Sequence, residues 1–173
     1  MKRAVIFLGV IVGLIALAWI VGSLTPRKHM ASSRITLSQP PDTVWAVIRD
    51  PAALKDTWAD LTEVRRSLDN GGREVWDEKV SGFDMRLIVE EDTPPSRLVT
   101  RIDAAPDAAF GGRWVYQLEP SGAGSAVIVT EEGWVGNPLY RLMSSLGGQH
   151  RSIDGYLTAL GKHFGQPVKP EHR

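Results

Sequence analysis

The chain has 173 residues, of which 43% are hydrophobic and 23% are charged, a composition typical of an ordered globular protein. It contains no cysteine, which excludes disulfide bonds and thiolate metal sites. The formal net charge is zero, but five of the 20 basic residues precede Asp42, the first acidic residue. This leaves 15 basic against 20 acidic residues, a charge of −5 over the rest of the chain. An acidic body of this kind argues against binding nucleic acid.

The first apolar segment, Ala4 to Leu24, contains no charged residue and is 21 residues long. That length is enough for a helix to cross a bilayer. The alternative is a cleaved signal peptide with a cut site at Ala16-Leu17-Ala18, but the apolar run continues past that site. We therefore expect residues 1–25 to be an uncleaved single-pass membrane anchor, followed by a linker over residues 26–32. Basic residues flank the span on both sides, so the loop-charge rule leaves its orientation open.

The middle of the chain has the alternation and turn residues of an antiparallel sheet. A first strand is expected at 33–38, followed by two short helices that begin at Pro40-Pro41 and after Asp50-Pro51. A strong hairpin turn is predicted at Asp69-Asn70-Gly71-Gly72, because Asn and Gly tolerate positive φ. Six further strands are expected at residues 62–68, 73–80, 83–91, 97–103, 113–119 and 125–132.

The last long segment begins at Asn137-Pro138, an N-cap residue followed by proline at the first helical position. The apolar residues after it recur at spacings of three, four or seven, which predicts one long helix with a single apolar stripe. Gly147-Gly148 interrupts this stripe, and each interior glycine costs about 1 kcal/mol relative to alanine. We expect close packing against the sheet there; a kink or a gate over a cavity is the alternative. The stripe consists of Leu139, Leu142, Leu146, Ile153, Leu157, Leu160 and Phe164.

Five short segments carry a resemblance to a known family: PDTVW at 41–45, Asp50-Pro51 with Trp58, TPPSRLV at 93–99, GGRWVY at 111–116 and TEEG at 130–133. With this order of elements they resemble the START/polyketide cyclase-like (SRPBCC) superfamily, within it the bacterial members with an N-terminal membrane span. The resemblance implies an α+β helix-grip fold over residues 33–165, in which a seven-stranded curved antiparallel sheet wraps around a long C-terminal helix. Residues 166–173 would then form a C-terminal tail.

The resemblance also implies a mainly apolar cavity between the sheet and the last helix. Strand alternation and the helix stripe select the side chains expected to line it. The alternative is that these side chains fill the space themselves and leave no cavity. The expected ligand-binding residues are Trp76, Glu78, Met85, Trp114, Tyr116, Leu142, Leu146 and Ile153.

The sequence shows no motif for a catalytic nucleophile, and no cofactor is expected. No histidine has metal-ligand spacing to another histidine or to a carboxylate, so no metal site is expected, and His150 and His163 are predicted to be solvated. Two carboxylates, Glu78 and Glu131, could act as a general acid or base if buried, since burial raises a carboxyl pKa. The alternative is that each pairs at a rim with an arginine, the candidates being Arg73, Arg101 and Arg113.

The expected function is a membrane-tethered binding or transfer module for an apolar small molecule, lipid-like or polyketide-like. Its partners would be that molecule and, through the N-terminal helix, a bacterial inner membrane; the oligomeric state is open. One alternative is an enzyme similar to polyketide cyclases and dehydratases, which would need a buried acid or base at the cavity. The other is a non-catalytic interaction or stress-response domain with a closed core.

Overall fold

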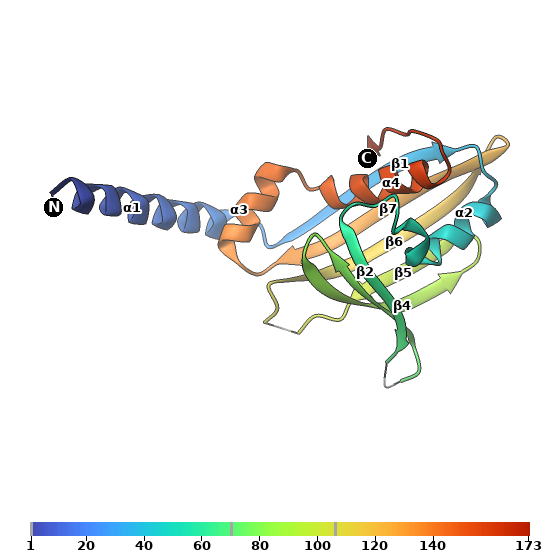
Figure 1. Cartoon of the computed structure of the whole chain (residues 1–173), viewed down its shortest axis with the longest axis horizontal. Coiled ribbons are helices and arrows are strands. Elements are labelled where there is room, and N and C mark those ends of the chain that lie inside the picture. The colour runs from blue at the N-terminus through green and yellow to red at the C-terminus, as the bar shows by residue number, and fades with distance from the viewer. Residues whose placement is uncertain (1, 70, 106) are drawn as a thin grey trace.

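The computed structural model describes residues 2–69, 71–105 and 107–173. Helix α1 (Lys2–Leu24) projects away from a body in which helices cover one face of a curved sheet (Figure 1). The sheet has the strand order β2-β3-β4-β5-β6-β7-β1-β8, and all of its neighbouring pairs are antiparallel. The strands are β1 (Lys28–Leu37), β2 (Leu61–Leu68), β3 (Glu74–Val80), β4 (Phe83–Thr93), β5 (Arg97–Ile102), β6 (Phe110–Ser121), β7 (Gly124–Val135) and β8 (Glu171–His172).

The short helices follow the first strand as predicted. Helix α2 (Pro41–Ile48) has proline at its first position, and the 3-10 helix η1 (Pro51–Leu54) is capped by Asp50, whose side chain accepts from the Ala52 N–H. The helix-grip fold of the α+β class is thereby confirmed, with all seven predicted strands present. Asn70, in the predicted hairpin turn, lies outside the described residues.

The sheet is larger than the sequence indicated on the side formed by β1 and β8. Strand β1 starts at Lys28, inside the expected linker, because β7 extends to Val135 and offers partners to the added residues, with Lys28 opposite Trp134. An eighth strand, β8, comes from the expected tail and pairs with β1 through Ser33 opposite His172.

The expected single C-terminal helix is instead two helices, α3 (Pro138–Gly147) and α4 (Arg151–His163). Gly148 has a φ of 85°, a left-handed conformation that favours glycine and ends α3. The expectation of close packing at these glycines is wrong, because a Cβ atom at either Gly147 or Gly148 would meet open space. The glycines therefore separate two helices with different surroundings.

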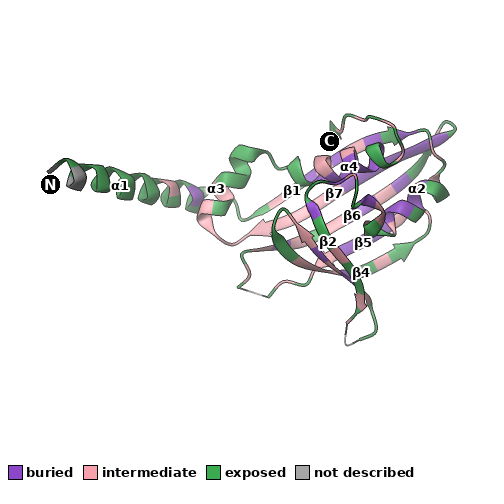
Figure 2. Ribbon diagram, in the orientation of Figure 1, coloured by how far each residue is buried: buried purple, intermediate pink, exposed green. Residues whose placement is uncertain are grey.

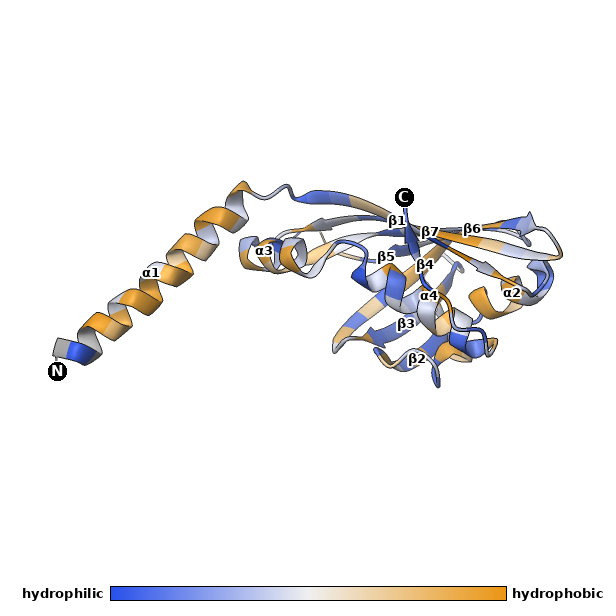
Figure 3. Cartoon of the chain, turned by 90° about the horizontal axis from the view of Figure 1, so that it is seen from above, coloured by the Kyte–Doolittle hydropathy of each residue, from blue (hydrophilic) through white to orange (hydrophobic). Residues whose placement is uncertain are grey.

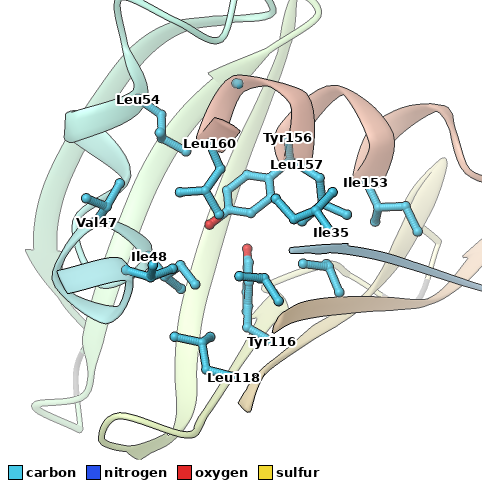
Figure 4. Close-up of a cluster of buried hydrophobic side chains, with 14 of the residues drawn as sticks. Ile35, Val47, Ile48, Leu54, Tyr116, Leu118, Ile153, Tyr156, Leu157 and Leu160 are labelled. Carbon is cyan, nitrogen blue, oxygen red and sulfur yellow. The ribbon is translucent and has the colours of Figure 1, made fainter. Parts of the chain in front are cut away.

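The core lies between α4, α2, η1 and the concave side of the sheet (Figure 4). Helix α4 contributes Ile153, Leu157 and Leu160, which are fully buried against side chains such as Val127 and Val129 of β7. Helix α3 differs, since none of its ten described residues is buried (Figure 2). Only the second half of the predicted apolar stripe, on α4, is therefore part of the core.

Candidate functional site: a cavity beside the end of helix α1

A cavity of about 420 Å³ lies between the sheet and the helices, within the range of about 300–1,000 Å³ usual for small-molecule sites. Strands β3 to β7 form its wall and floor, and α3, α4 and the connection from α1 to β1 close its other sides. The cavity therefore has the position expected for this fold, and the alternative of a core completely filled by side chains does not hold.

One end of the cavity lies beside the point where α1 ends. Thr25 and Arg27, from the connection between α1 and β1, contribute to its lining there, together with Arg141 of α3. The Arg141 guanidinium donates to the Thr25 carbonyl at 3.0 Å and to the Gly136 carbonyl at 3.3 Å, which holds α3 against the end of α1. Exposed residues such as Ser145 also line this end, so the cavity reaches the surface here.

The inner end of the cavity has aromatic walls. The ring of Tyr156 meets those of Trp58, Trp114 and Tyr116 edge-on, with centroids 5.4–5.7 Å apart. Figure 4 shows the hydroxyl groups of Tyr116 and Tyr156 directed into the same space between α4 and the sheet. Such rings supply a large apolar contact surface with a few polar atoms at its edge.

Two buried donors at this end have no hydrogen-bond partner among the described residues, the Trp58 indole N–H and the Tyr156 hydroxyl. Buried polar atoms are nearly always hydrogen-bonded in native proteins, so an exception calls for a reason. Both residues line the cavity. A bound molecule with one hydrogen-bond acceptor would satisfy a donor here.

Glu78 of β3 also lines the cavity and is only 7% exposed. Burial raises the pKa of this carboxyl to about 7, and no described residue forms an ion pair with it. Burial also raises the pKa of the Tyr116 and Tyr156 hydroxyls, with a further contribution from the Glu78 charge, so the three groups act on one another across the same space. Near neutral pH, Glu78 can either accept or donate a proton.

Glu131 of β7, the second candidate carboxylate, has partners at the cavity. Its Oε1 lies 2.9 Å from Nε2 of His29, and its Oε2 accepts from the Trp114 indole N–H at 3.1 Å. None of the three arginines proposed as rim partners reaches either candidate. Arg73 pairs with Asp69, Arg101 with Glu90 and Arg113 with Glu132. Glu131 thus orients an aromatic wall, whereas Glu78 is a buried carboxylate of the site without an ion-pair partner among the described residues.

Four of the eight expected site residues line the cavity, and a fifth lies next to it. The four are Glu78, Met85, Trp114 and Tyr116. Trp76 lines a small adjoining space of about 20 Å³, which it shares with Glu78 and Tyr116.

The three expected residues from the C-terminal helices are not among those that line the cavity. Ile153 is fully buried in the contact between α4 and the sheet, Leu146 is 80% exposed on α3, and Leu142 is half-buried on the same helix. The cause is the break at Gly147-Gly148, since α3 then presents Ser144 and Arg141 to the cavity.

Sequence reasoning missed Trp58, Tyr156 and His29 as lining residues. Trp58 belongs to a segment that carries the family resemblance, so a signal was present. Tyr156 lies three residues after Ile153, a spacing that places it beside the apolar stripe of α4. His29 gave no signal, because its position was expected to be a linker.

A second polar cluster joins α4 to β1 and β8, the last two strands at one edge of the sheet. The Ser33 hydroxyl donates to Asp154 at 2.7 Å and lies 3.1 Å from Nδ1 of His150, while Nε2 of His172 lies 2.8 Å from Asp154. Two predictions are thereby wrong: His150 is partly buried, and it stands four residues before a carboxylate, a metal-ligand spacing that was overlooked.

The three groups His150, Asp154 and His172 are close enough to hold a metal ion. The two imidazole rings, however, are stacked with centroids 3.8 Å apart and planes within 14°. A ligating nitrogen directs its lone pair in the plane of its ring, so parallel stacked rings do not converge on one ion. The cluster is better described as a set of side-chain contacts that holds β8 against α4.

Comparisons with known proteins agree with this fold. Residues 28–160 match the family model described as polyketide cyclase/dehydrase and lipid transport. A search of curated protein sequences finds no match.

Solved structures with the same fold include Mll3558 from Rhizobium loti, 25% identical, with a TM-score of 0.57 over 79% of this chain and 96% of the other. TTHA0849 from Thermus thermophilus is 19% identical, with a TM-score of 0.59 over 78% and 96% of the two chains. A START superfamily protein from Mycobacterium smegmatis is 14% identical, with a TM-score of 0.56 over 76% and 94%. The chain therefore belongs to the polyketide cyclase/dehydrase and lipid transport family of the START/SRPBCC superfamily.

Proposed function

We propose that this protein is a membrane-tethered module that binds an apolar small molecule and exchanges it with the bilayer. The observation that carries the proposal is the position of the cavity, whose accessible end is built by the residues that directly follow α1 and by α3. A ligand that dissolves in the bilayer would meet the cavity where the anchor leaves the membrane. The family, whose description includes lipid transport, is consistent with such a ligand.

The tether itself is supported by the surroundings of α1. Its segment Ile6–Leu24 is long and apolar enough to cross a bilayer, and almost none of it is buried by the rest of the protein. A core helix of a soluble protein would be covered, whereas α1 is hydrophobic along its length (Figure 3) and its large apolar side chains are exposed. A signal sequence passes the same test of length and composition. The contact of α1 with α3 favours a retained anchor.

The chemistry of the cavity supports a mainly apolar ligand with one polar group. Aromatic rings form the walls, while the Trp58 indole, the Tyr156 hydroxyl and Glu78 are polar groups without partners at the inner end. A hydroxyl or carbonyl oxygen on the ligand would accept a hydrogen bond there. A saturated hydrocarbon would leave these buried groups unsatisfied, at a cost of about 1–3 kcal/mol each.

Glu78 also supports a second candidate function, acid–base catalysis on the bound molecule. A carboxyl group with a pKa of about 7 is suited to transfer protons at neutral pH, and it faces the space that the ligand would occupy. Turnover that is abolished by Glu78→Gln while ligand binding persists would favour an enzyme of the cyclase or dehydratase type over a carrier.

Photolabelling of the full chain in lipid nanodiscs tests the proposed function. A long-chain alcohol with a photoactivatable diazirine should label peptides of β3 to β6 in addition to the lipid-facing residues of α1. Ser145→Trp narrows the accessible end of the cavity and should reduce labelling of the strands several-fold. Ser121→Trp, at the β6–β7 hairpin away from the cavity, is the matched control and should leave the labelling unchanged. Labelling confined to α1 in every variant would refute the proposal.

A further inference from the structure

We infer that the outer face of α3, together with two phenylalanines at the rim of the cavity, docks onto the surface of the bilayer that holds α1. We call this set the docking surface and define it by Met143, Leu146, Phe83 and Phe110. The inference rests on the tether of the proposed function. It adds a specific interface, which lies outside the transmembrane segment.

Helix α3 has its polar side inward and its apolar side outward. Arg141, Ser144 and Ser145 line the cavity. On the opposite face, Met143 is 66% exposed and Leu146 is 80% exposed. A surface helix of a soluble domain normally does the reverse and buries its apolar stripe, as α4 does here. The apolar face of α3 therefore needs another medium to cover it.

The bilayer is the covering that the structure indicates, because α3 is held at the end of the membrane anchor. A side chain at Gly22 of α1 would overlap the Pro138 carbonyl at the start of α3, so the two backbones are in direct contact. The Arg141 guanidinium also donates to Thr25, one residue after α1 ends. Figure 1 shows α3 beside that end of α1, which is where the chain would leave the hydrocarbon layer.

The opposite rim of the cavity is aromatic. Phe83, at the start of β4, is 48% exposed, and its ring meets that of Phe110, at the start of β6, edge-on at 5.4 Å. Both residues line the cavity. Strand alternation turns the neighbouring Asp84 to the other face of the sheet. Phenylalanine is one of the residues with which interfacial protein segments contact the acyl region of a bilayer.

The charges around α3 agree with this partner. The helix contains no acidic residue. The exposed Arg27 and Lys28 lie three and four residues after the end of α1, and the exposed Arg151 follows the turn after α3. Cations beside an apolar face suit a surface with anionic lipid head groups. With the docking surface on the bilayer, a ligand could enter the cavity without crossing bulk water.

Site-directed fluorescence in nanodiscs tests the inference, and the absence of native cysteine allows one label at a time. Single-cysteine variants of the full chain, Met143→Cys and Leu146→Cys, would carry an environment-sensitive fluorophore. Leu68→Cys is the matched control, since Leu68 is also an exposed apolar residue, 65% exposed, but lies at the end of β2. Nanodiscs with and without doxyl-labelled phospholipid report whether each label contacts lipid.

We expect blue-shifted emission and several-fold stronger quenching by doxyl lipid at positions 143 and 146 than at position 68. Water-like emission at all three positions would overturn the inference while the tether stands. Blue-shifted emission without lipid quenching would also overturn it, because a second protein segment would then cover α3. A chain that does not stay with the nanodiscs during flotation would refute the tether, and the docking surface with it.

Discussion

Glu78→Gln gives the sharpest test of the cavity, because one buried carboxyl should make the stability of the whole domain depend on pH. Burial raises the pKa of Glu78 from an ordinary value of 4.5 to about 7. The folded protein therefore holds this proton in a pH range where the unfolded chain has released it. With respect to this group, the free energy of unfolding is therefore highest below pH 4.5. It falls as the pH rises from 4.5 to about 7 and stays low above that.

The size of the effect follows from the difference between the two pKa values. At about 1.4 kcal/mol for each pKa unit, Glu78 should destabilise the fold above pH 7 by about 3 kcal/mol relative to its contribution at pH 4.5. Glutamine is similar in size and carries no charge. Glu78→Gln should therefore unfold at higher denaturant concentration than the wild type at pH 8, and the difference should shrink towards pH 5.

The assay is urea unfolding of the full chain in detergent micelles, followed by tryptophan fluorescence at pH 5, 6, 7 and 8. Glu119→Gln is the matched control, because Glu119 is exposed on β6 and its replacement should leave the pH dependence unchanged. A wild type and a Glu78→Gln variant whose stability difference is constant from pH 5 to 8 would refute the argument that Glu78 is buried without a charged partner.

Three further predictions concern the fold around the cavity. Leu157→Ala should lower the free energy of unfolding by about 2–5 kcal/mol, because Leu157 is fully buried, whereas Leu146→Ala on exposed α3 should cost the domain almost nothing in detergent. Arg49 holds the pKa of Glu74 at about 2, and this adds stability above pH 4.5 that is lost as the pH falls towards 2. Arg49→Ala should therefore cost about 1–3 kcal/mol at pH 7, because solvent screens part of the pair, and far less near pH 2, measured by the same unfolding assay. His172→Ala should release β8, seen as faster hydrogen exchange of the last residues with a loss of about 1 kcal/mol. Unchanged exchange would show that backbone pairing alone holds this strand.

The two C-terminal helices show that an apolar periodicity does not by itself decide which residues are buried. The apolar stripe was readable along the whole segment, yet only α4 uses its part of the stripe in the core. Both helices have the same local pattern, and α3 differs because the break at Gly148 takes it away from the sheet and against α1. Of the expected site residues, those on strands reached the cavity or the small space beside it and those on the helices did not, for this reason.

Local chemistry along the chain was sufficient for most of the elements. Strand alternation, the proline and asparagine residues at the helix starts, and the uncharged first segment predicted seven strands, the starts of α2, η1 and α3, and α1. These features depend on neighbours a few residues away, and such neighbours are fixed by the order of the chain.

Only the tertiary structure decided the properties that depend on groups distant in sequence. Glu78 is buried because other elements of the fold cover β3, and Glu131 is paired because β1 places His29 beside β7. The contact between His172 and Asp154 exists because β8 pairs with β1. A pKa, an unpaired donor or an exposed apolar face results from the desolvation and contacts that packing creates, and no spacing within one segment specifies which elements will meet.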